Sequence, residues 1–214
     1  MKRRLRRSRG YRTKGVFLNI PFDDQYEDCF IALIAGVAGL GLLPTSVLEV
    51  AASSQRLQRI FKHLLRCRYS IHDLSRVELS NGRYPRFNMP FEAGLATALV
   101  LTTNHHERFL FESRRYRLAK TCSDLDGVDV KIHGARPRGV LRAVLNAFVR
   151  PRQTPRLDEL ERLYAALRVR ALELKRDAAT LYEAYPFREL AAFAIALAAS
   201  QRRQDRRTPI TRGK

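Results

Sequence analysis

Short apolar runs alternate with longer amphipathic segments along the first 150 residues of the chain. Each short run has the length of a buried strand and ends at a polar or glycine-containing turn. These runs lie at residues 15–20, 43–50, 68–71, 108–111 and 128–132. The segments between them repeat apolar residues every three or four positions, which is the spacing of helices. Helices are therefore predicted at residues 26–40, 53–65, 88–101, 116–125 and 137–148.

The regular alternation of strands and helices predicts one α/β domain over residues 15–150. Such a domain has a parallel sheet with helices on both faces and right-handed crossovers. We therefore expect a flavodoxin-like architecture. The first helix should be capped by Asp23 or Asp24. It should bury one apolar stripe, formed by Phe30, Ile31, Leu33, Ile34, Val37 and Ala38.

The second predicted helix has a less regular apolar stripe. Ser53 or Ser54 is the expected N-cap, and His63 is expected on the helix surface. The residues expected to point inward are Leu57, Ile60, Phe61, Leu64 and Leu65.

The chain changes character after the linker PRQTPR at residues 151–156. Two long helical patterns follow at 157–178 and 181–200, with a break expected near Tyr185 and Pro186. The hairpin at 156–200 cannot bury its own apolar residues, so it should pack on the α/β domain or on another subunit. The second alternative would make the protein a homo-oligomer.

The net charge of +19 is concentrated at the two ends of the chain. Residues 1–14 carry +8 and residues 201–214 carry +5, which leaves +6 for the rest. We expect the arm at 1–14 and the tail at 201–214 to be disordered. They are either merely solvated or bind nucleic acid without sequence specificity through counterion release.

Composition excludes several classes of protein. No apolar run approaches the roughly 20 residues of a membrane span, and no secretory signal is recognisable, so a cytoplasmic location is expected. Three widely spaced cysteines indicate neither a disulfide framework nor a zinc site. His105, His106 and His133 lack ligand partners at suitable spacing, so no metal is expected.

The stretch from His72 to Ala96 has the character of a ligand site. An acidic residue, Asp73, follows a buried strand, and the loop after it carries Arg76, Arg83 and Arg86. Glu92 then lies near the start of a helix that opens at Asn88. In an open α/β sheet, ligands bind beyond the carboxyl ends of the strands, where this loop should lie.

Three short motifs within the first 149 residues, FLNIPFDDQYE, YSIHDLSR and FNMPFEAGLA, resemble the TIR-like and nucleoside 2-deoxyribosyltransferase-like group of bacterial proteins. The resemblance implies a flavodoxin-like fold and a glutamate that attacks or stabilises the anomeric carbon of a nucleoside or of NAD. In the E-x-G-x-A motif of this chain, that residue is Glu92. The acidic residue that positions the sugar or base corresponds to Asp73. Further substrate contacts are expected from these motifs and from the loop between the last two, at Asn19, Pro21, Phe22, Asp23, Ser75, Arg76, Arg86, Asn88 and Gly94.

Each of these residues also has a structural interpretation. Glu92 could serve only as a partner of the helix dipole or as an N-terminal cap. In any of its roles, a position near the helix start should keep it ionised at neutral pH. Asp73 could be a turn or capping carboxylate, and Gly94 could serve helix-to-sheet packing. The loop arginines either bind phosphate or are solvated.

Two functions of different class follow. The first is an enzyme that cleaves or transfers at the N-glycosidic bond of a nucleoside, a nucleotide or NAD, with no cofactor. The second is a non-catalytic TIR-like signalling or assembly module whose basic tails bind polyanions.

Overall fold

The computed structural model describes residues 14–50, 55–76, 79–80, 84–125, 127–148 and 154–207. Within these ranges the chain forms a five-stranded sheet with the order β2-β1-β3-β6-β7, and every neighbouring pair is parallel. The strands are β1 (Gly15–Asn19), β2 (Leu43–Ser46), β3 (Tyr69–Asp73), β6 (Glu107–Glu112) and β7 (Val130–Ile132). This order confirms the flavodoxin-like fold, because the direction of the strand order reverses between β1 and β3.

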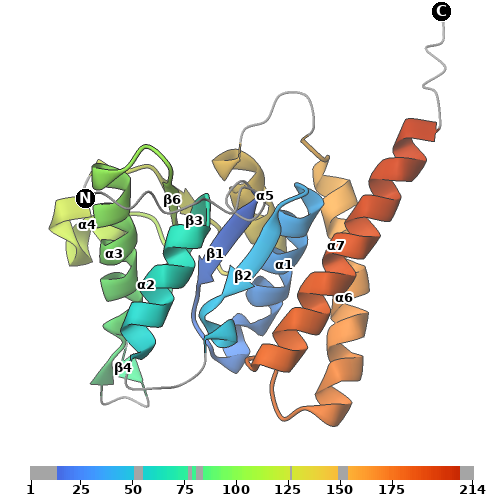
Figure 1. The fold of residues 1–214 in the computed structure, drawn as a ribbon, viewed down its shortest axis with the longest axis horizontal. Helices are drawn as coiled ribbons and strands as arrows, with labels where there is room; N and C mark the ends of the chain where they lie inside the picture. The colour runs from blue at the N-terminus through green and yellow to red at the C-terminus, as the bar shows by residue number, and fades with distance from the viewer. Residues whose placement is uncertain are drawn as a thin grey trace, which may run out of the picture.

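Helices cover both faces of the sheet (Figure 1). One face carries α1 (Glu27–Gly39) and α5 (Pro137–Ala147). The opposite face carries α2 (Arg56–Arg66), α3 (Asn88–Thr102) and α4 (Arg117–Thr121). Single 3-10 turns and one short antiparallel pair complete this part of the chain. They are η1 (Asp24–Tyr26), η2 (Val47–Glu49), η3 (Ser123–Leu125), β4 (Leu79–Ser80) and β5 (Tyr84–Pro85).

Alternation along the strands decides which side chain faces which layer. Val16, Leu18 and Ile71 belong to the apolar cluster that contains α1 and α5. Phe17 faces the other way and packs with Leu64 of α2 and other residues of the α2/α3 layer. The same alternation determines the face toward which each polar residue at a strand end points.

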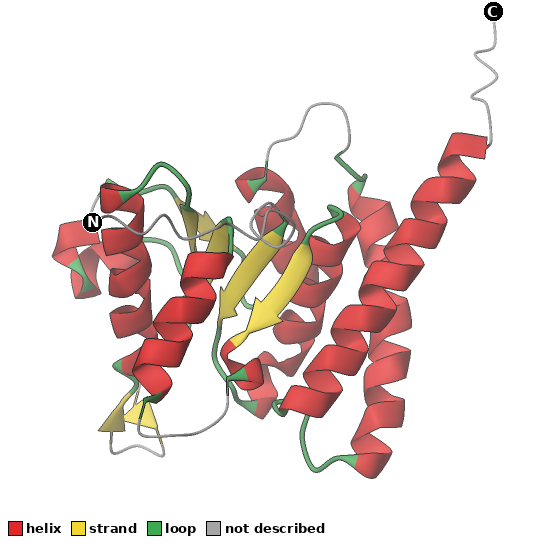
Figure 2. Ribbon diagram, viewed as in Figure 1, coloured by secondary structure: helices red, strands yellow, loops and turns green. Residues whose placement is uncertain are grey.

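The last two helices, α6 (Leu157–Asp177) and α7 (Ala184–Arg207), form a hairpin that packs on α1. Figure 2 shows this hairpin as an additional helical layer, with α1 between it and the strands. Of the two alternatives for the hairpin, packing on the α/β domain is therefore observed. Polar contacts cross the interface, including Lys175 Nζ to Glu27 Oε2 at 3.1 Å and Tyr164 Oη to Asp28 Oδ1 at 3.0 Å.

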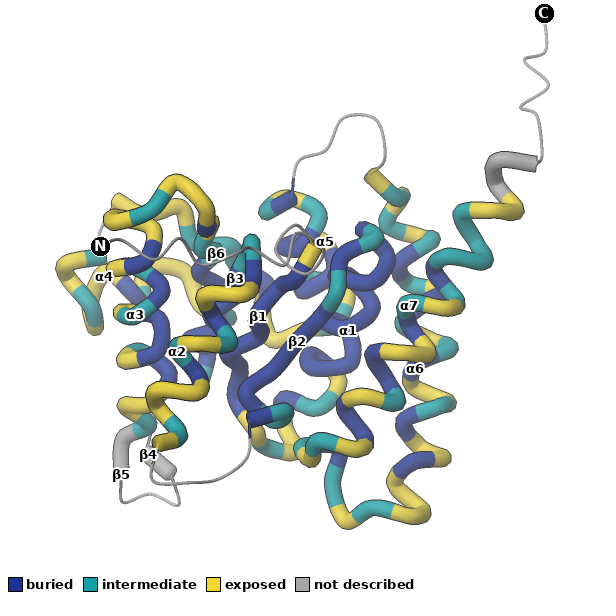
Figure 3. The backbone as a smooth tube through the Cα atoms, viewed as in Figure 1, coloured by how far each residue is buried: buried dark blue, intermediate teal, exposed yellow. Residues whose placement is uncertain are grey.

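Because the hairpin covers its outer side, α1 is buried all round and not along one stripe (Figure 3). All eleven residues from Cys29 to Gly39 are buried. The single-stripe expectation for this helix was too narrow. The sequence EDCFIALIAGVAG suits a helix in the centre of a domain, since apolar and small residues occupy every side of it.

Several predicted boundaries were wrong for identifiable reasons. The second strand ends at Ser46, because Ser46 and Glu49 form a capping box that starts the η2 turn. Neither Asp23 nor Asp24 caps α1: its N-cap is Tyr26, and Asp23 makes no side-chain capping bond to η1. The predicted caps Ser53 and Ser54 lie outside the described residues, and α2 begins at Arg56.

The inward-facing residues of α2 and the predicted helix at 116–125 also differ from expectation. Leu57 and Leu65 of α2 are exposed, whereas Ile60 and Leu64 are buried. The predicted helix at 116–125 is interrupted at Cys122 between α4 and η3. Its first residue, Tyr116, has a left-handed backbone with φ of 60°.

The expected break near Pro186 is also wrong, and so is the expected disorder over residues 201–207. Pro186 lies in the first turn of α7, where a missing N–H costs nothing, and the helix continues to Arg207. Arg202 is part of the fold, since its Nη1 donates to the carbonyl oxygens of Ala38 and Gly39 at the end of α1. The arm at 1–13 and residues 208–214 lie outside the described part of the chain. No helix in the described ranges has the length and apolar character that crossing a bilayer requires.

Candidate functional site

The candidate site lies at the carboxyl ends of β1 and β3, where the strand order reverses. Asn19, the last residue of β1, holds the start of α3 at this edge. Its Nδ2 donates to the carbonyl oxygen of Met89 and to His72 Nδ1, each at 3.0 Å. Because Nδ1 of His72 accepts, the proton of the neutral imidazole is on Nε2. Asn19 is thus a positioning residue at the predicted site.

Glu92 is one turn beyond Met89 on the inner side of α3. Met89, Ala93, Ala96 and Leu99 are buried on the same side of the helix, and Glu92 is only 8% exposed. Its Oε2 atom is buried and has no hydrogen-bond partner among the described residues. A buried carboxyl oxygen without a partner is costly in a structure, and such atoms require an explanation.

The expectation that the helix start would keep Glu92 ionised at neutral pH is wrong. Burial raises the pKa of Glu92 to about 7, and the Arg56 guanidinium opposes this rise only in part. Glu92 lies in the second turn of α3, beyond the first-turn N–H groups that favour an anion. The carboxyl is therefore close to half ionised at pH 7.

His72 is a second buried polar group on the α2/α3 side of the sheet. Its Nε2 atom has no hydrogen-bond partner among the described residues. Burial, with smaller contributions from Arg108 and His106, lowers the pKa of His72 to about 3, so the ring is neutral. Sequence reasoning missed this residue, although its position next to Asp73 at a strand end was a signal.

Asp73 points to the opposite face of the sheet, toward α1 and α5. It is completely buried and accepts hydrogen bonds from the Tyr26 hydroxyl, from Ser75 N at 2.9 Å and from His133 Nε2 at 3.0 Å. Burial by itself would raise the pKa of Asp73. The hydrogen bond and charge of His133, with the bonds from Ser75 and Tyr26, outweigh burial and hold the pKa below its usual value.

One buried cluster has the residue types of a nucleophilic triad but not its geometry: Ser75, His133 and Asp73. In a triad, the serine and the carboxylate contact different ring nitrogens. Here Ser75 Oγ, at 2.8 Å, and Asp73 Oδ2, at 3.0 Å, approach the same atom, His133 Nε2. His133 Nδ1 instead lies 3.2 Å from Ala135 N. All three side chains are buried, which makes the cluster a structural one.

Glu92 and Asp73 are therefore not brought together. Ile71 and Asp73 share the α1/α5 face of β3, whereas α3 packs on the face to which Phe17 and Asn19 point. The turn-carboxylate alternative for Asp73 is observed in its bond to Ser75 N. Ser75 is likewise buried and bonded to His133.

Ion pairs connect the loop after β1 with the segment between β3 and α3. Asp23 Oδ2 lies 2.8 Å from Arg86 Nη1 and 3.3 Å from Arg76 Nε. Arg76 Nη1 also donates to Gln25 Oε1 at 2.6 Å. The two arginines are thus held together by one carboxylate, while Arg83 lies outside the described residues.

The C-terminal hairpin contributes one residue that sequence reasoning missed at this edge. The hydroxyl of Tyr182, between α6 and α7, donates to the carbonyl oxygen of Asp23 at 2.6 Å. Its ring centroid is 5.5 Å from that of Phe22. No local pattern in the sequence could have found this contact, because 159 positions separate the bonded residues.

The remaining predicted residues differ in accessibility. Pro21 is buried, whereas Asn88 and Gly94 are exposed. A Cβ atom built on Gly94 would meet nothing within 4 Å, so the helix-to-sheet packing alternative for this glycine is wrong. Phe87 and Phe91, 73% and 55% exposed, flank the start of α3 on its outer side.

The described residues contain no group of three potential metal ligands. His106 is bonded to Ser70 Oγ at 2.8 Å, and His133 belongs to the Asp73 cluster. The three cysteines are free, and burial raises the pKa of Cys29 to about 12 and that of Cys67 to about 11. These two thiols are therefore protonated at neutral pH and are poor nucleophiles.

No protein-family model matches the chain, and neither a curated protein nor a solved structure matches it. The candidate site is therefore defined by its geometry alone.

Proposed function

We propose that this protein cleaves or transfers at the N-glycosidic bond of a nucleoside, a nucleotide or NAD, with Glu92 facing the anomeric carbon. The observation that carries the proposal is the buried Glu92 carboxyl, which has a raised pKa and an unpartnered oxygen. Perturbed carboxyl groups of this kind gather at functional sites. The carboxyl lies beside the point where ligands bind in sheets of this order.

In the proposed reaction, the bond between the base nitrogen and the anomeric carbon breaks with its electron pair on the base. The ionised Glu92 carboxylate stabilises the oxocarbenium-like state or traps it as a glycosyl ester. Water or an acceptor base then attacks the anomeric carbon, and the departing base takes up a proton. Glu92 must be ionised for either role, so the rate should rise with pH through about 7.

Arg76 and Arg86 are the proposed contacts for a phosphate of the substrate. Asp23 holds both guanidinium groups at the edge of the site, and their side chains remain 33% and 24% exposed. One shared carboxylate leaves the three groups with a net positive charge. Asp73 acts here only as a positioning residue, since it fixes the turn that leads to Arg76.

The test is release of free base, measured by chromatography after incubation with NAD and a panel of nucleosides and nucleotides. Glu92→Gln should reduce the rate by about 10² to 10³ if charge stabilisation is the main contribution. The control is Glu107→Gln, which alters a half-exposed glutamate that pairs with Arg68 at the opposite end of the sheet.

A Glu92→Gln protein that folds normally and releases base at the wild-type rate would refute this role for Glu92. No base release from any substrate would favour the alternative, a cytoplasmic TIR-like signalling or assembly module. The basic terminal segments would then be its contacts to polyanions.

A further inference from the structure

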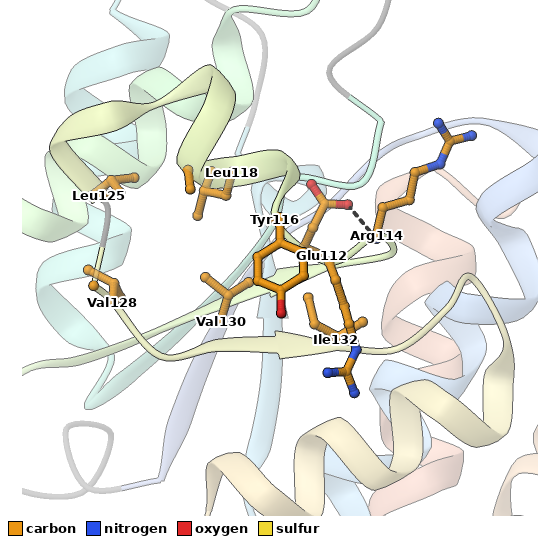
Figure 4. A pocket seen from close by; sticks show the side chains of 11 residues that line it. Glu112, Arg114, Tyr116, Leu118, Leu125, Val128, Val130 and Ile132 are labelled. Carbon is orange, nitrogen blue, oxygen red and sulfur yellow. Dashed lines mark hydrogen bonds between the residues drawn. The ribbon is translucent and has the colours of Figure 1, made fainter.

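A pocket lies away from Glu92, at the carboxyl ends of β6 and β7. It has a volume of about 230 Å³, is partly open to solvent, and is lined by residues of β6, β7, α4, η3 and the turns beside them (Figure 4). Its walls are mainly aliphatic and are formed by Leu118, Leu125, Val128, Val130 and Ile132. Pockets for drug-sized ligands measure about 300–1,000 Å³, so this one suits a single ring.

Tyr116 supplies an aromatic wall in an unusual backbone conformation. Its φ of 60° is rare for a bulky residue, and its side chain is 77% exposed. Figure 4 shows the ring among the aliphatic side chains of the pocket rather than folded into the core. Strained residues of this kind occur preferentially where a ligand is held.

The charged residues that line the pocket favour an anion. Glu112, the acid in the lining, is already neutralised: Arg117 contacts both of its carboxylate oxygens, and Ser113 N and Arg114 N donate to Oε1. Arg115 lines the pocket and is exposed. Its guanidinium has no ion-pair partner among the described residues. Arg114 also lies at the rim, but its guanidinium points away from Tyr116 in Figure 4.

We propose that this pocket binds a small aromatic anion, one ring bearing a carboxylate or a phosphate. The ring stacks on Tyr116 and packs against Val130 and Ile132, and the anionic group pairs with Arg115. Offset stacking on tyrosine and a charge-assisted bond to arginine are the two interactions that the lining offers. The site is independent of the proposed reaction at Glu92, because the apolar cluster of Leu74, Met89, Ala93, Leu110 and Leu118 lies between α3 and α4.

The test is to titrate the full chain with benzoate and with phenyl phosphate. Binding is measured from the changes in amide chemical shifts in NMR spectra. Benzyl alcohol and inorganic phosphate serve as the neutral and ring-free probes. Saturable shifts at residues 115–132 are expected with at least one aromatic anion and with neither control probe. The better of the two anions distinguishes a carboxylate from a phosphate ligand.

Three variants separate the interactions. Arg115→Gln should raise the dissociation constant of the better anion at least five-fold, whereas Arg114→Gln, the matched control, should change it less than two-fold. Tyr116→Gly should weaken binding at least five-fold while raising the melting temperature, because glycine adopts a positive φ without strain. If Tyr116 had a purely structural role, its replacement would not weaken binding and raise the melting temperature at the same time.

The proposal is overturned if neither anion produces saturable shifts at the pocket. It is also overturned if benzyl alcohol binds as tightly as benzoate, or if Arg114→Gln and Arg115→Gln weaken binding equally.

Discussion

His133 Nε2 lies 3.0 Å from Asp73 Oδ2 and so joins the end of β7 to the end of β3, two strands that are not neighbours in the sheet. The contact passes over the α1/α5 face of β6 and is completely buried. This contact fixes the loops at the carboxyl ends of β3 and β7 on the α1/α5 face of the sheet. Asn19 fixes the start of α3 on the opposite face. The edge that carries the candidate site is thus held rigidly on both sides of the sheet.

Gly139→Ala should disturb this link. A Cβ atom at Gly139 would lie 1.9 Å from the carbonyl oxygen of His133, and a backbone atom cannot move aside without shifting the whole turn. We expect a loss of unfolding free energy of at least about 2 kcal/mol, measured by urea denaturation.

Gly94→Ala is the matched control for this substitution. It has open space around the new methyl group and should instead stabilise α3 by about 0.5–1 kcal/mol. Equal effects of the two substitutions would contradict the packing described for Gly139.

Glu92→Gln should change how stability depends on pH. The pKa of Glu92 is about 7 in the folded chain and near 4.5 when exposed, so the folded protein retains a proton that the unfolded chain loses. Wild-type stability should therefore fall as the pH rises from 4.5 to 7, by up to about 3 kcal/mol. The glutamine variant lacks this contribution and should be the more stable protein at pH 8, with little difference at pH 4.5.

The comparison needs urea unfolding curves for both proteins at several pH values. Glu107→Gln serves as the control in the same series, since it changes a half-exposed carboxylate at the opposite end of the sheet. Parallel profiles for wild type and Glu92→Gln would mean that the carboxyl is not buried as described.

Asp73→Asn should destabilise the fold more than it alters any chemistry. The carboxylate oxygens accept from Tyr26, Ser75 and His133, and an amide group would place a donor against one of these donors. Breaking a buried charged network costs roughly 3 kcal/mol or more. Thermal denaturation should show a large drop for this variant and little change for Asp129→Asn, whose side chain is 80% exposed.

Removal of α6 and α7 by truncation after residue 150 should leave the α/β domain insoluble or self-associating. The truncation uncovers the outer side of α1, where Gly39 lies directly against Leu160. Light scattering should detect aggregates, and thermal denaturation a lower midpoint. A monomeric truncated protein with an unchanged melting temperature would rule out this role for the hairpin.

The sheet and its helices could be predicted because their signals are local. The run at 15–20 and the Pro137 start of α5 specify their own elements through apolar content and a first-turn proline. The sequence alone could not tell whether α1 is buried on every side or along one stripe, because that depends on what covers its outer side.

The candidate site was predicted less completely for a related reason. A sequence places Asp73 and Glu92 near one sheet edge but does not give the face toward which each side chain points. A shift of one residue in the register of β3 would have turned Asp73 to the opposite face of the sheet. The His133 and Tyr182 contacts join positions 60 or more apart in sequence, and no spacing rule covers such distances.

The contact of Arg202 with the end of α1 has a consequence for biosynthesis. The bonded residues are more than 160 positions apart, so a ribosome has made nearly all of the described chain before α1 acquires its last partner. Until α6 and α7 have been made, the outer side of this apolar helix lacks the residues that cover it in the folded protein. Contacts so distant in sequence delay folding, and transiently exposed apolar surface invites aggregation. The last contacts of α1 can therefore form only after nearly the whole described chain has been synthesised.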